Sequence, residues 1–281
     1  MGKFSTLINL TRINKPIGIF LLLWPTLSAL WLASEGIPNI KILVIFILGT
    51  ILMRSAGCVA NDLADRKFDS FVKRTKNRPI TSGLVSIQEA IILLLSLLIA
   101  SFLLVIQFNY LTIWISFLAF LFTLTYPFTK RFFNLPQLYL GVTFGFGILM
   151  AFSAVQNKIP IEALILFGSN IFWAFAYDSH YAISDMEDDK KLNIHSAPLT
   201  FNNKIVLILT LSYFLMFLHL FIIGILKEFT LSFYVFMGLA IIISMYGCFE
   251  GRHMDPSKNF KAFLRNNYVG ILIFVGFLTQ I

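Results

Sequence analysis

Eight of the fourteen acidic residues of this chain gather in two short segments. The first segment reads Asn-Asp-Leu-Ala-Asp-Arg-Lys-Phe-Asp from Asn61, and the second runs from Asp178 to Asp189. Hard divalent cations prefer carboxylate oxygens, and Mg²⁺ is usually held by one or two carboxylates together with phosphate oxygens of a substrate. Two carboxylate clusters therefore predict a site that grips a diphosphate through bound Mg²⁺.

Within each cluster the acids repeat at the spacing of about one helical turn. Asn61, Asp65 and Asp69 are four residues apart, and so are Asp185 and Asp189. If helices continue through both clusters, each set projects from one helix face. Like charges at this spacing destabilise a bare helix, so we predict these five residues as metal ligands. The remaining acids are equally well explained as solvated residues at helix ends: Asp62, Glu187 and Asp188.

Basic residues near the clusters are candidates for holding phosphate oxygens. Arginine suits a diphosphate because its planar fork donates paired hydrogen bonds. Arg54 lies inside an apolar stretch two turns before Asn61, where an arginine is costly unless it meets a partner or a ligand. Lys130 and Arg131 follow a later apolar stretch. For most of the basic residues after the first cluster, contact with anionic lipid is the favoured interpretation: Lys73, Arg74, Lys76 and Arg78.

The elements that must position these residues are membrane-spanning helices. Of the 281 residues, 58% are hydrophobic and 13% are charged, whereas an ordinary soluble domain carries about 25% charged residues. Apolar stretches recur along the chain, each long enough to cross a hydrocarbon core about 30 Å thick. The expected fold is an all-α polytopic bundle, one domain over residues 1–281, embedded in a lipid bilayer. Its nine candidate helices are 17–33, 41–60, 88–107, 111–126, 137–155, 161–181, 204–226, 231–248 and 267–281.

The basic residues predict how this bundle is oriented. Short loops alternate with longer, charged loops, so the long loops lie on one side. Of the 22 Lys and Arg residues, eighteen fall on that side, three on the other, and Arg54 lies within a span. Cytoplasmic loops are enriched in Lys and Arg. We therefore expect the N-terminus and both acidic clusters at the cytoplasmic face of the cell inner (plasma) membrane.

Several other classes of protein fit less well. Cys58 and Cys248 lack Cys-x-x-Cys spacing, so neither a disulfide framework nor a zinc site is predicted. The net charge of +8 comes from loops between spans, and no nucleic-acid partner is expected. A cation transporter would place its ion sites near the bilayer midplane, whereas these acids follow the ends of spans. The Asp-Gly-x-x-Ala-Arg pattern of CDP-alcohol phosphotransferases is absent.

Seven short segments, in order along the chain, form a more specific pattern. They are Lys-Pro-Ile-Gly-Ile-Phe-Leu-Leu-Leu-Trp-Pro-Thr from Lys15, Met-Arg-Ser-Ala-Gly-Cys from Met53, Asn-Asp-x-x-Asp-x-x-x-Asp from Asn61, Lys-Arg-Thr-x-Asn-Arg-Pro at 73–79, Tyr-Pro-Phe-x-Lys-Arg at 126–131, Leu-Pro-Gln at 135–137 and Tyr-Asp-x-x-Tyr-Ala-x-x-Asp at 177–185. With these segments the chain resembles the UbiA-type membrane prenyltransferases over essentially its whole length.

The resemblance implies nine transmembrane helices around a central cavity. It implies that Mg²⁺ and a polyprenyl diphosphate bind at the cytoplasmic mouth, with the isoprenoid tail in a tunnel open to lipid. It assigns the metals to Asn61, Asp65, Asp69, Asp185 and Asp189, and the phosphate oxygens to Arg131, Lys130 and Lys73. The four aspartates and Arg131 form the expected catalytic set. Arg54 is expected at the carboxylate of the acceptor, and the substrate-binding set is completed by Tyr177, Asp178 and Tyr181.

The reaction implied is transfer of the polyprenyl group to the ring carbon of 4-hydroxybenzoate that is ortho to the hydroxyl, as in ubiquinone biosynthesis. The chain departs from the family after the second cluster, where Gly-Ile-Lys-Ser-Thr is usual and His195 replaces the lysine. Histidine can be neutral at pH 7. Because His-Ser-x-Pro resembles some relatives of the menaquinone route, a naphthoate acceptor is the main alternative, followed by homogentisate and haem.

Overall fold

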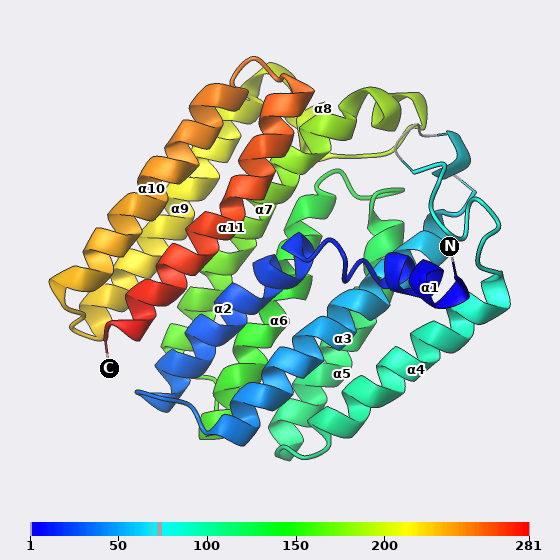
Figure 1. The fold of residues 1–281 in the computed structure, drawn as a ribbon. Coiled ribbons are helices and arrows are strands. Elements are labelled where there is room, and N and C mark those ends of the chain that lie inside the picture. The colour runs from blue at the N-terminus through cyan, green and yellow to red at the C-terminus, as the bar shows by residue number, and fades with distance from the viewer. Residues whose placement is uncertain (1, 68, 72–74, 281) are drawn as a thin grey trace.

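The computed structural model describes residues 2–67, 69–71 and 75–280, and it is helical without strands over that part of the chain (Figure 1). Nine long helices make up most of it, as the sequence predicts. They are α2 (Ile17–Ser34), α3 (Ile40–Asp65), α4 (Ile87–Val105), α5 (Tyr110–Thr129), α6 (Pro136–Gln156), α7 (Ile161–Lys191), α9 (Ile205–Leu226), α10 (Leu231–Gly251) and α11 (Pro256–Leu278). The short elements are α1 (Lys3–Thr11), α8 (Ala197–Phe201) and the 3₁₀ turns η1 (Asp69–Phe71) and η2 (Asn202–Lys204).

Judged by length and composition alone, seven of the described helices could cross a membrane. They are α2, α3, α4, α5, α6, α9 and α10. The two other long helices, α7 and α11, carry more polar and charged residues. Large apolar side chains on the outer faces of α4 and α5 are exposed, as expected for helices that meet lipid rather than water. The predicted multi-pass helical bundle is confirmed.

Capping residues set several of the helix starts. Asn39 Oδ1 accepts a hydrogen bond from the backbone N–H of Lys41 at the start of α3. Ser86 and Glu89 form a reciprocal capping box at the start of α4. Asp255 accepts from the Lys258 N–H at the start of α11, which lowers the pKa of Asp255 below its usual value. These groups satisfy backbone donors that have no partner within the helix.

Three predicted helix boundaries are wrong because polar residues continue the helices beyond their apolar parts. The shortest extension is that of α3, which runs to Asp65 rather than to residue 60. The sixth predicted helix, 161–181, extends to Lys191 as α7. The last predicted helix, 267–281, begins at Pro256 as α11 because Asp255 caps it eleven residues earlier. Loss of hydrophobicity marks where a span leaves the apolar core and does not mark where the helix ends.

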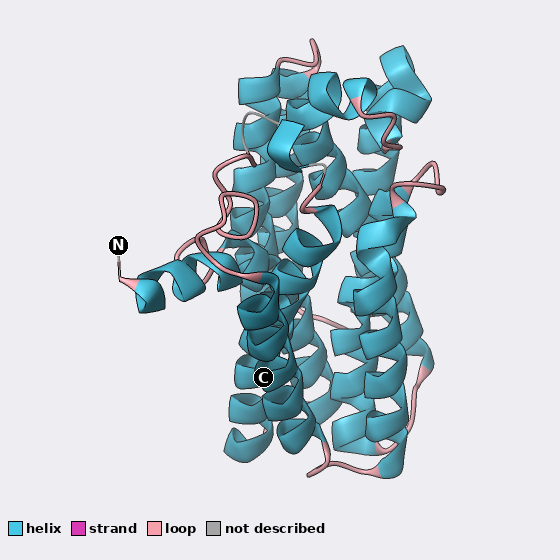
Figure 2. Ribbon diagram, turned by 90° about the vertical axis from the view of Figure 1, so that its right-hand side faces the viewer, coloured by secondary structure: helices cyan, strands magenta, loops and turns pink. Residues whose placement is uncertain are grey.

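The long helices lie roughly along one common axis, and α1 lies across them at the side of the bundle (Figure 2). α7 packs against α6, α9 and α11, while α2 packs against α6 and α11 and α4 packs mainly against α3. The segments that follow α3 and the extended end of α7 lie at the same end of the bundle (Figure 1). A cavity of about 1580 Å³ opens there and is lined by residues of α2 to α7 and α11.

Buried polar side chains fasten α7 to its neighbours. Asn266 Oδ1 of α11 accepts hydrogen bonds from Trp173 Nε1 at 2.8 Å and from the Tyr213 hydroxyl at 3.1 Å. Asn259 Oδ1 is hydrogen-bonded to His180 Nδ1 at 2.7 Å. Buried polar groups are costly unless they are paired, so these contacts favour one arrangement of α7, α9 and α11. They hold the helix that carries the second acidic cluster.

Candidate active site

The first acidic cluster is divided between a helix end and a turn. α3 ends at Asp65, and Asp69 begins the separate turn η1, so the condition that one helix continues from Asn61 through Asp69 is not met. Asp69 is held from further along the chain, because Thr75 Oγ1 donates to the Asp69 carbonyl at 3.0 Å and Arg78 donates to its carboxylate at 2.7 Å. Asn61, Asp65 and Asp69 nevertheless line the same cavity.

The second cluster lies on a continuous helix, which is the condition under which its acids share one face. Asp185 and Asp189 are one turn apart on the extended part of α7, and both line the cavity. Asp188 lines it as well, whereas Glu187 is exposed and is not among the lining residues. The two clusters, more than a hundred residues apart in sequence, therefore meet at one cavity, and all five predicted metal ligands contribute to its wall.

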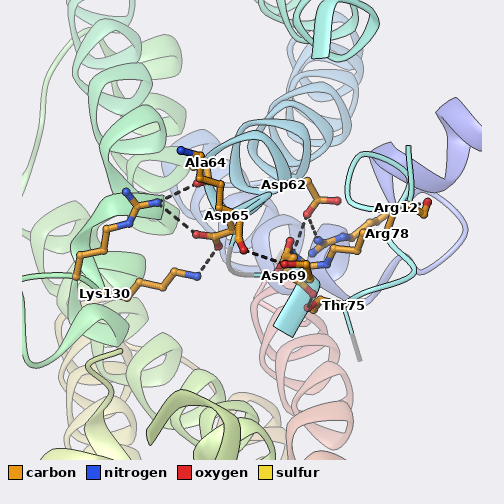
Figure 3. A network of polar contacts seen from close by, with 12 residues as sticks. Arg12, Asp62, Ala64, Asp65, Asp69, Thr75, Arg78 and Lys130 are labelled. Carbon is orange, nitrogen blue, oxygen red and sulfur yellow. Dashed lines mark hydrogen bonds and ion pairs between the residues drawn. The ribbon is translucent and has the colours of Figure 1, made fainter. Parts of the chain in front are cut away.

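The predicted cations of the 126–131 segment both lie near Asp65, and Figure 3 shows Lys130 pointing toward it. Lys130 forms an ion pair with Asp65 Oδ2 and lines the cavity. Arg131 lies 3.7 Å from Asp65 Oδ1 and donates to the carbonyl oxygen of Ala64 at 2.9 Å. Arg131 is exposed and does not contribute to the cavity wall. The third predicted phosphate ligand, Lys73, lies outside the described residues.

Two further arginines belong to the first cluster and were not in the predicted site. Arg12, at the end of α1, and Arg78 both form ion pairs with Asp62, and Arg78 also pairs with Asp69 (Figure 3). The interpretation of Arg78 as a residue that contacts anionic lipid is therefore wrong, since its guanidinium pairs with Asp62 and Asp69. The Asn-Arg-Pro segment at 77–79 was a signal for Arg78. Arg12 had none, because fifty positions separate it from Asp62.

Arg54 lies deeper, on the wall of the same cavity. Its Nη1 is 2.8 Å from Cys58 Sγ, and its guanidinium lies over the ring of Phe144 at 5.9 Å from the ring centre. Gly18 of α2 leaves the space that this side chain fills, because a Cβ there would be 2.5 Å from Arg54 Nε. Asp178 is within electrostatic range of Arg54. The predicted residues Tyr177, Asp178 and Tyr181 also line the cavity.

Four buried polar atoms on cavity-lining residues have no hydrogen-bond partner among the described residues. They are Arg54 Nε, Asp65 Oδ1, Tyr177 Oη and Ser196 Oγ. Since buried polar groups are normally paired, each is available to a polar group of a ligand. The carboxylate and amide oxygens around Asp65 are the kind of ligand that Mg²⁺ binds together with phosphate oxygens. No three described His, Cys, Asp or Glu side chains form a metal-binding group by themselves.

The segment that departs from the family pattern also reaches this mouth. The backbone N–H of His195 donates to the carbonyl oxygen of Lys130 at 2.9 Å, and the Ala197 N–H donates to Gln137 Oε1 at 3.0 Å. His195 and Ser196 line the cavity. The segment after α7 is therefore tied to the end of α5 and the start of α6, and His195 lies at the site.

Comparison with known proteins finds relatives that match most of this chain. A model of the UbiA prenyltransferase family matches residues 22–272. A 4-hydroxybenzoate octaprenyltransferase of Nitrosomonas eutropha is 47% identical over 278 residues, which cover 98% of this chain and 96% of that protein.

Solved structures share the fold. A UbiA homolog from Aeropyrum pernix superposes with a TM-score of 0.77 at 24% identity, covering 93% of this chain and 97% of that one. A UbiA homolog from Archaeoglobus fulgidus, bound to GPP and Mg²⁺, gives 0.74 at 18% identity, with 98% and 99% covered. The resemblance found in the sequence motifs is thereby confirmed, and this chain belongs to the UbiA prenyltransferase family.

Proposed function

We propose that this protein transfers a polyprenyl group from a polyprenyl diphosphate to the ring carbon of 4-hydroxybenzoate ortho to its hydroxyl, a step of ubiquinone biosynthesis. The observation that carries the proposal is the match over nearly the whole chain to a 4-hydroxybenzoate octaprenyltransferase at 47% identity. The cavity is consistent with it, because the carboxylates of the mouth, the half-buried Arg54 and apolar side chains of α4 and α5 all line it.

The mouth is suited to a diphosphate with Mg²⁺. The proposed metal ligands are Asn61, Asp65, Asp69, Asp185 and Asp189, all of which line the cavity. Mg²⁺ bound there would neutralise charge that grows on the leaving diphosphate. Lys130, beside Asp65, is placed to donate charge-assisted hydrogen bonds to phosphate oxygens. Arg131 and Lys73 remain candidates for the same role on sequence grounds.

The deeper part of the cavity is suited to the aromatic acid. Arg54 has a buried Nε without a partner among the described residues, and a planar guanidinium matches the geometry of a carboxylate. Tyr177 Oη is buried and likewise free of a described partner. We assign the acceptor carboxylate to Arg54 and place Tyr177, Asp178 and Tyr181 around the ring.

The tail of the donor has an apolar path from the mouth. Phe102 of α4 and Phe117 and Phe120 of α5 line the cavity, and α4 and α5 contact each other only sparsely. We propose that the isoprenoid chain lies along this path between α4 and α5. Its apolar wall also keeps water away from a reactive allylic carbon.

The proposed chemistry breaks one bond and forms another. The allylic C–O bond breaks with its electron pair leaving on the diphosphate, and the ring carbon ortho to the phenol bonds to the allylic carbon. The ring then loses a proton, to a carboxylate of the mouth or to the released diphosphate. Fixed charges that meet the charge developing in a transition state usually supply the largest part of the rate. In this chain those charges stand at the mouth, around Asp65 and Lys130.

We propose that the mouth faces the cytoplasm from the bacterial inner membrane. The support is the excess of Lys and Arg in the loops on the side of the N-terminus, because cytoplasmic loops carry such an excess. Both acidic clusters follow helices toward that same side, so a water-soluble aromatic acid and Mg²⁺ would reach the mouth from the cytoplasm.

The proposal is tested by prenyl transfer in membranes that contain the protein. Geranyl diphosphate is supplied with labelled 4-hydroxybenzoate, with Mg²⁺ or with EDTA, and in parallel with a dihydroxynaphthoate acceptor. Mg²⁺-dependent product from the benzoate is the expected result. Product from the naphthoate alone would move the protein to menaquinone synthesis, and no product from either acceptor would refute the proposal.

A further inference from the structure

Asp62 of the first cluster is buried beside two arginines. It is 2% exposed and forms ion pairs through Oδ1 with Arg12 and, at 3.1 Å, with Arg78 Nη1. Its neighbour Asp65 is paired differently: Oδ2 forms an ion pair with Lys130, while Oδ1 has no hydrogen bond in the described part of the chain and has Arg131 at 3.7 Å. The two adjacent aspartates therefore have different electrostatic surroundings (Figure 3).

These surroundings argue against Asp62 as a metal ligand. Two guanidinium groups occupy the approach to Asp62 Oδ1, and each would repel a divalent cation at that oxygen. Breaking such a buried pair is costly because it leaves an uncompensated charge away from water. A metal at Asp62 would have to displace two cations at once.

Arg78 connects Asp62 to Asp69 through a single nitrogen. Its Nη1 is 3.1 Å from Asp62 Oδ1 and 2.7 Å from Asp69 Oδ2. The backbone N–H of Arg78 also donates to the carbonyl oxygen of Thr75 at 2.9 Å. Thr75 Oγ1 in turn donates to the carbonyl oxygen of Asp69 at 3.0 Å. Both the carboxylate and the backbone of Asp69 are thus held by the 75–78 turn.

The Arg78 bridge fixes the position of Asp69 beyond the end of α3, where no helix does so. Because α3 ends at Asp65, helical register cannot fix the position of Asp69 relative to Asn61 and Asp65. Asp62 lies on the last turn of α3, so a bridge from Asp62 to Asp69 transmits the position of the helix to the turn. The Arg12 contact adds the end of α1 to the same anchor.

We propose that Asp62 is a positioning residue that anchors Arg78, and that Arg78 in turn holds the Asp69 carboxylate at the mouth of the cavity. The inference rests on the proposed function, in which Asp69 helps to hold Mg²⁺ for the diphosphate. It assigns to Asp62 a role through Arg78, distinct from the direct role of Asp65.

The test measures ligand binding without turnover. Purified full-length protein binds labelled geranyl diphosphate in the absence of acceptor, and the Mg²⁺ concentration for half-maximal binding is determined. We expect Asp62→Asn and Arg78→Met each to raise that concentration on the order of tenfold. The double variant should resemble Arg78→Met alone, because residues that act through one contact are not additive.

A conservative replacement separates positioning from direct coordination. Since one nitrogen of Arg78 makes both carboxylate contacts, the Lys ammonium, with three donors on one nitrogen, can make them too. Arg78→Lys should therefore stay within about threefold of the wild type. Glu250→Gln is the matched control, because it removes the carboxylate of an ion pair with Arg265 on residues that do not line the cavity.

The outcomes are distinct. An unchanged Mg²⁺ requirement in Asp62→Asn, in protein whose thermal midpoint matches that of Glu250→Gln, would overturn the inference. So would loss of binding in Asp62→Asn as complete as in Asp65→Asn with full additivity to Arg78→Met, because that pattern belongs to a direct ligand. Absence of Mg²⁺-dependent binding in the wild type would instead refute the proposed function on which the inference depends.

Discussion

The contact between Gly18 and Arg54 allows a quantitative prediction about the acceptor. A Cβ added at Gly18 would lie 2.5 Å from Arg54 Nε and Nη2 and 2.8 Å from Cζ. Non-bonded heavy atoms rest at about 3.5 to 4.0 Å, so the guanidinium must move by roughly 1 Å. A displacement of that size can cost about 10²-fold in rate. We expect Gly18→Ala to lower kcat/KM for 4-hydroxybenzoate on the order of 10- to 10²-fold.

The assay and its control follow from the same cavity. Initial rates are measured against 4-hydroxybenzoate at saturating geranyl diphosphate, and Mg²⁺-dependent binding of geranyl diphosphate is measured separately. Binding should be unchanged, since Arg54 lies away from the mouth. Gly49 also lines the cavity, but a Cβ there meets nothing within 4 Å, so Gly49→Ala should keep normal kinetics. An unchanged kcat/KM in Gly18→Ala would refute the assignment of Arg54 to the acceptor.

Three further predictions concern charge and helix packing. Asp65→Asn should reduce prenyl transfer by about 10²-fold or more, measured with geranyl diphosphate at high Mg²⁺; retained activity would contradict its role. Asn259→Ala removes the buried partner of His180 and should lower the thermal midpoint, with a cost of about 1–3 kcal/mol; activity should persist at low temperature. The hydrogen bond to Glu162 raises the pKa of Lys227, so its stabilisation is complete below the unfolded pKa of about 10.4 and is lost as pH rises through the folded value. The thermal midpoint of Lys227→Met should therefore lie below that of the wild type at pH 8 and approach it above about pH 10.4.

The second acidic cluster could be predicted from sequence, and the first could be predicted only in part. Asp185 and Asp189 lie at helical spacing on a helix that continues through them, so local pattern and structure agree. Asp69 has the same spacing from Asp65, yet α3 ends between them. Asp69 is held by contacts from the 75–78 turn, which local spacing does not encode.

Long-range partners account for most of what the sequence did not reveal. Arg54 was identifiable because an arginine within an apolar span needs a partner, but Gly18, which makes room for it, carries no signal of its own. Arg12 pairs with Asp62 across fifty positions. Such pairs depend on how α1, α2 and α3 pack, and the types and local spacing of the residues do not determine that packing.

The ion pairs at the mouth imply that Mg²⁺ and the diphosphate assist each other in binding. Lys130 contacts the same carboxylate, that of Asp65, to which we assign a metal. A divalent cation at Asp65 competes with the Lys130 ammonium, and phosphate oxygens offer that ammonium a new anionic partner. Each ligand therefore removes part of the cost of binding the other, and such coupling is necessarily reciprocal. Asp62 takes no part in this exchange, since its partners Arg12 and Arg78 hold it on the side away from Lys130 (Figure 3). Asp65 can thus exchange Lys130 for a metal while Asp62 keeps Arg12 and Arg78. The site can then bind a charged ligand while the turn that carries Asp69 stays in place.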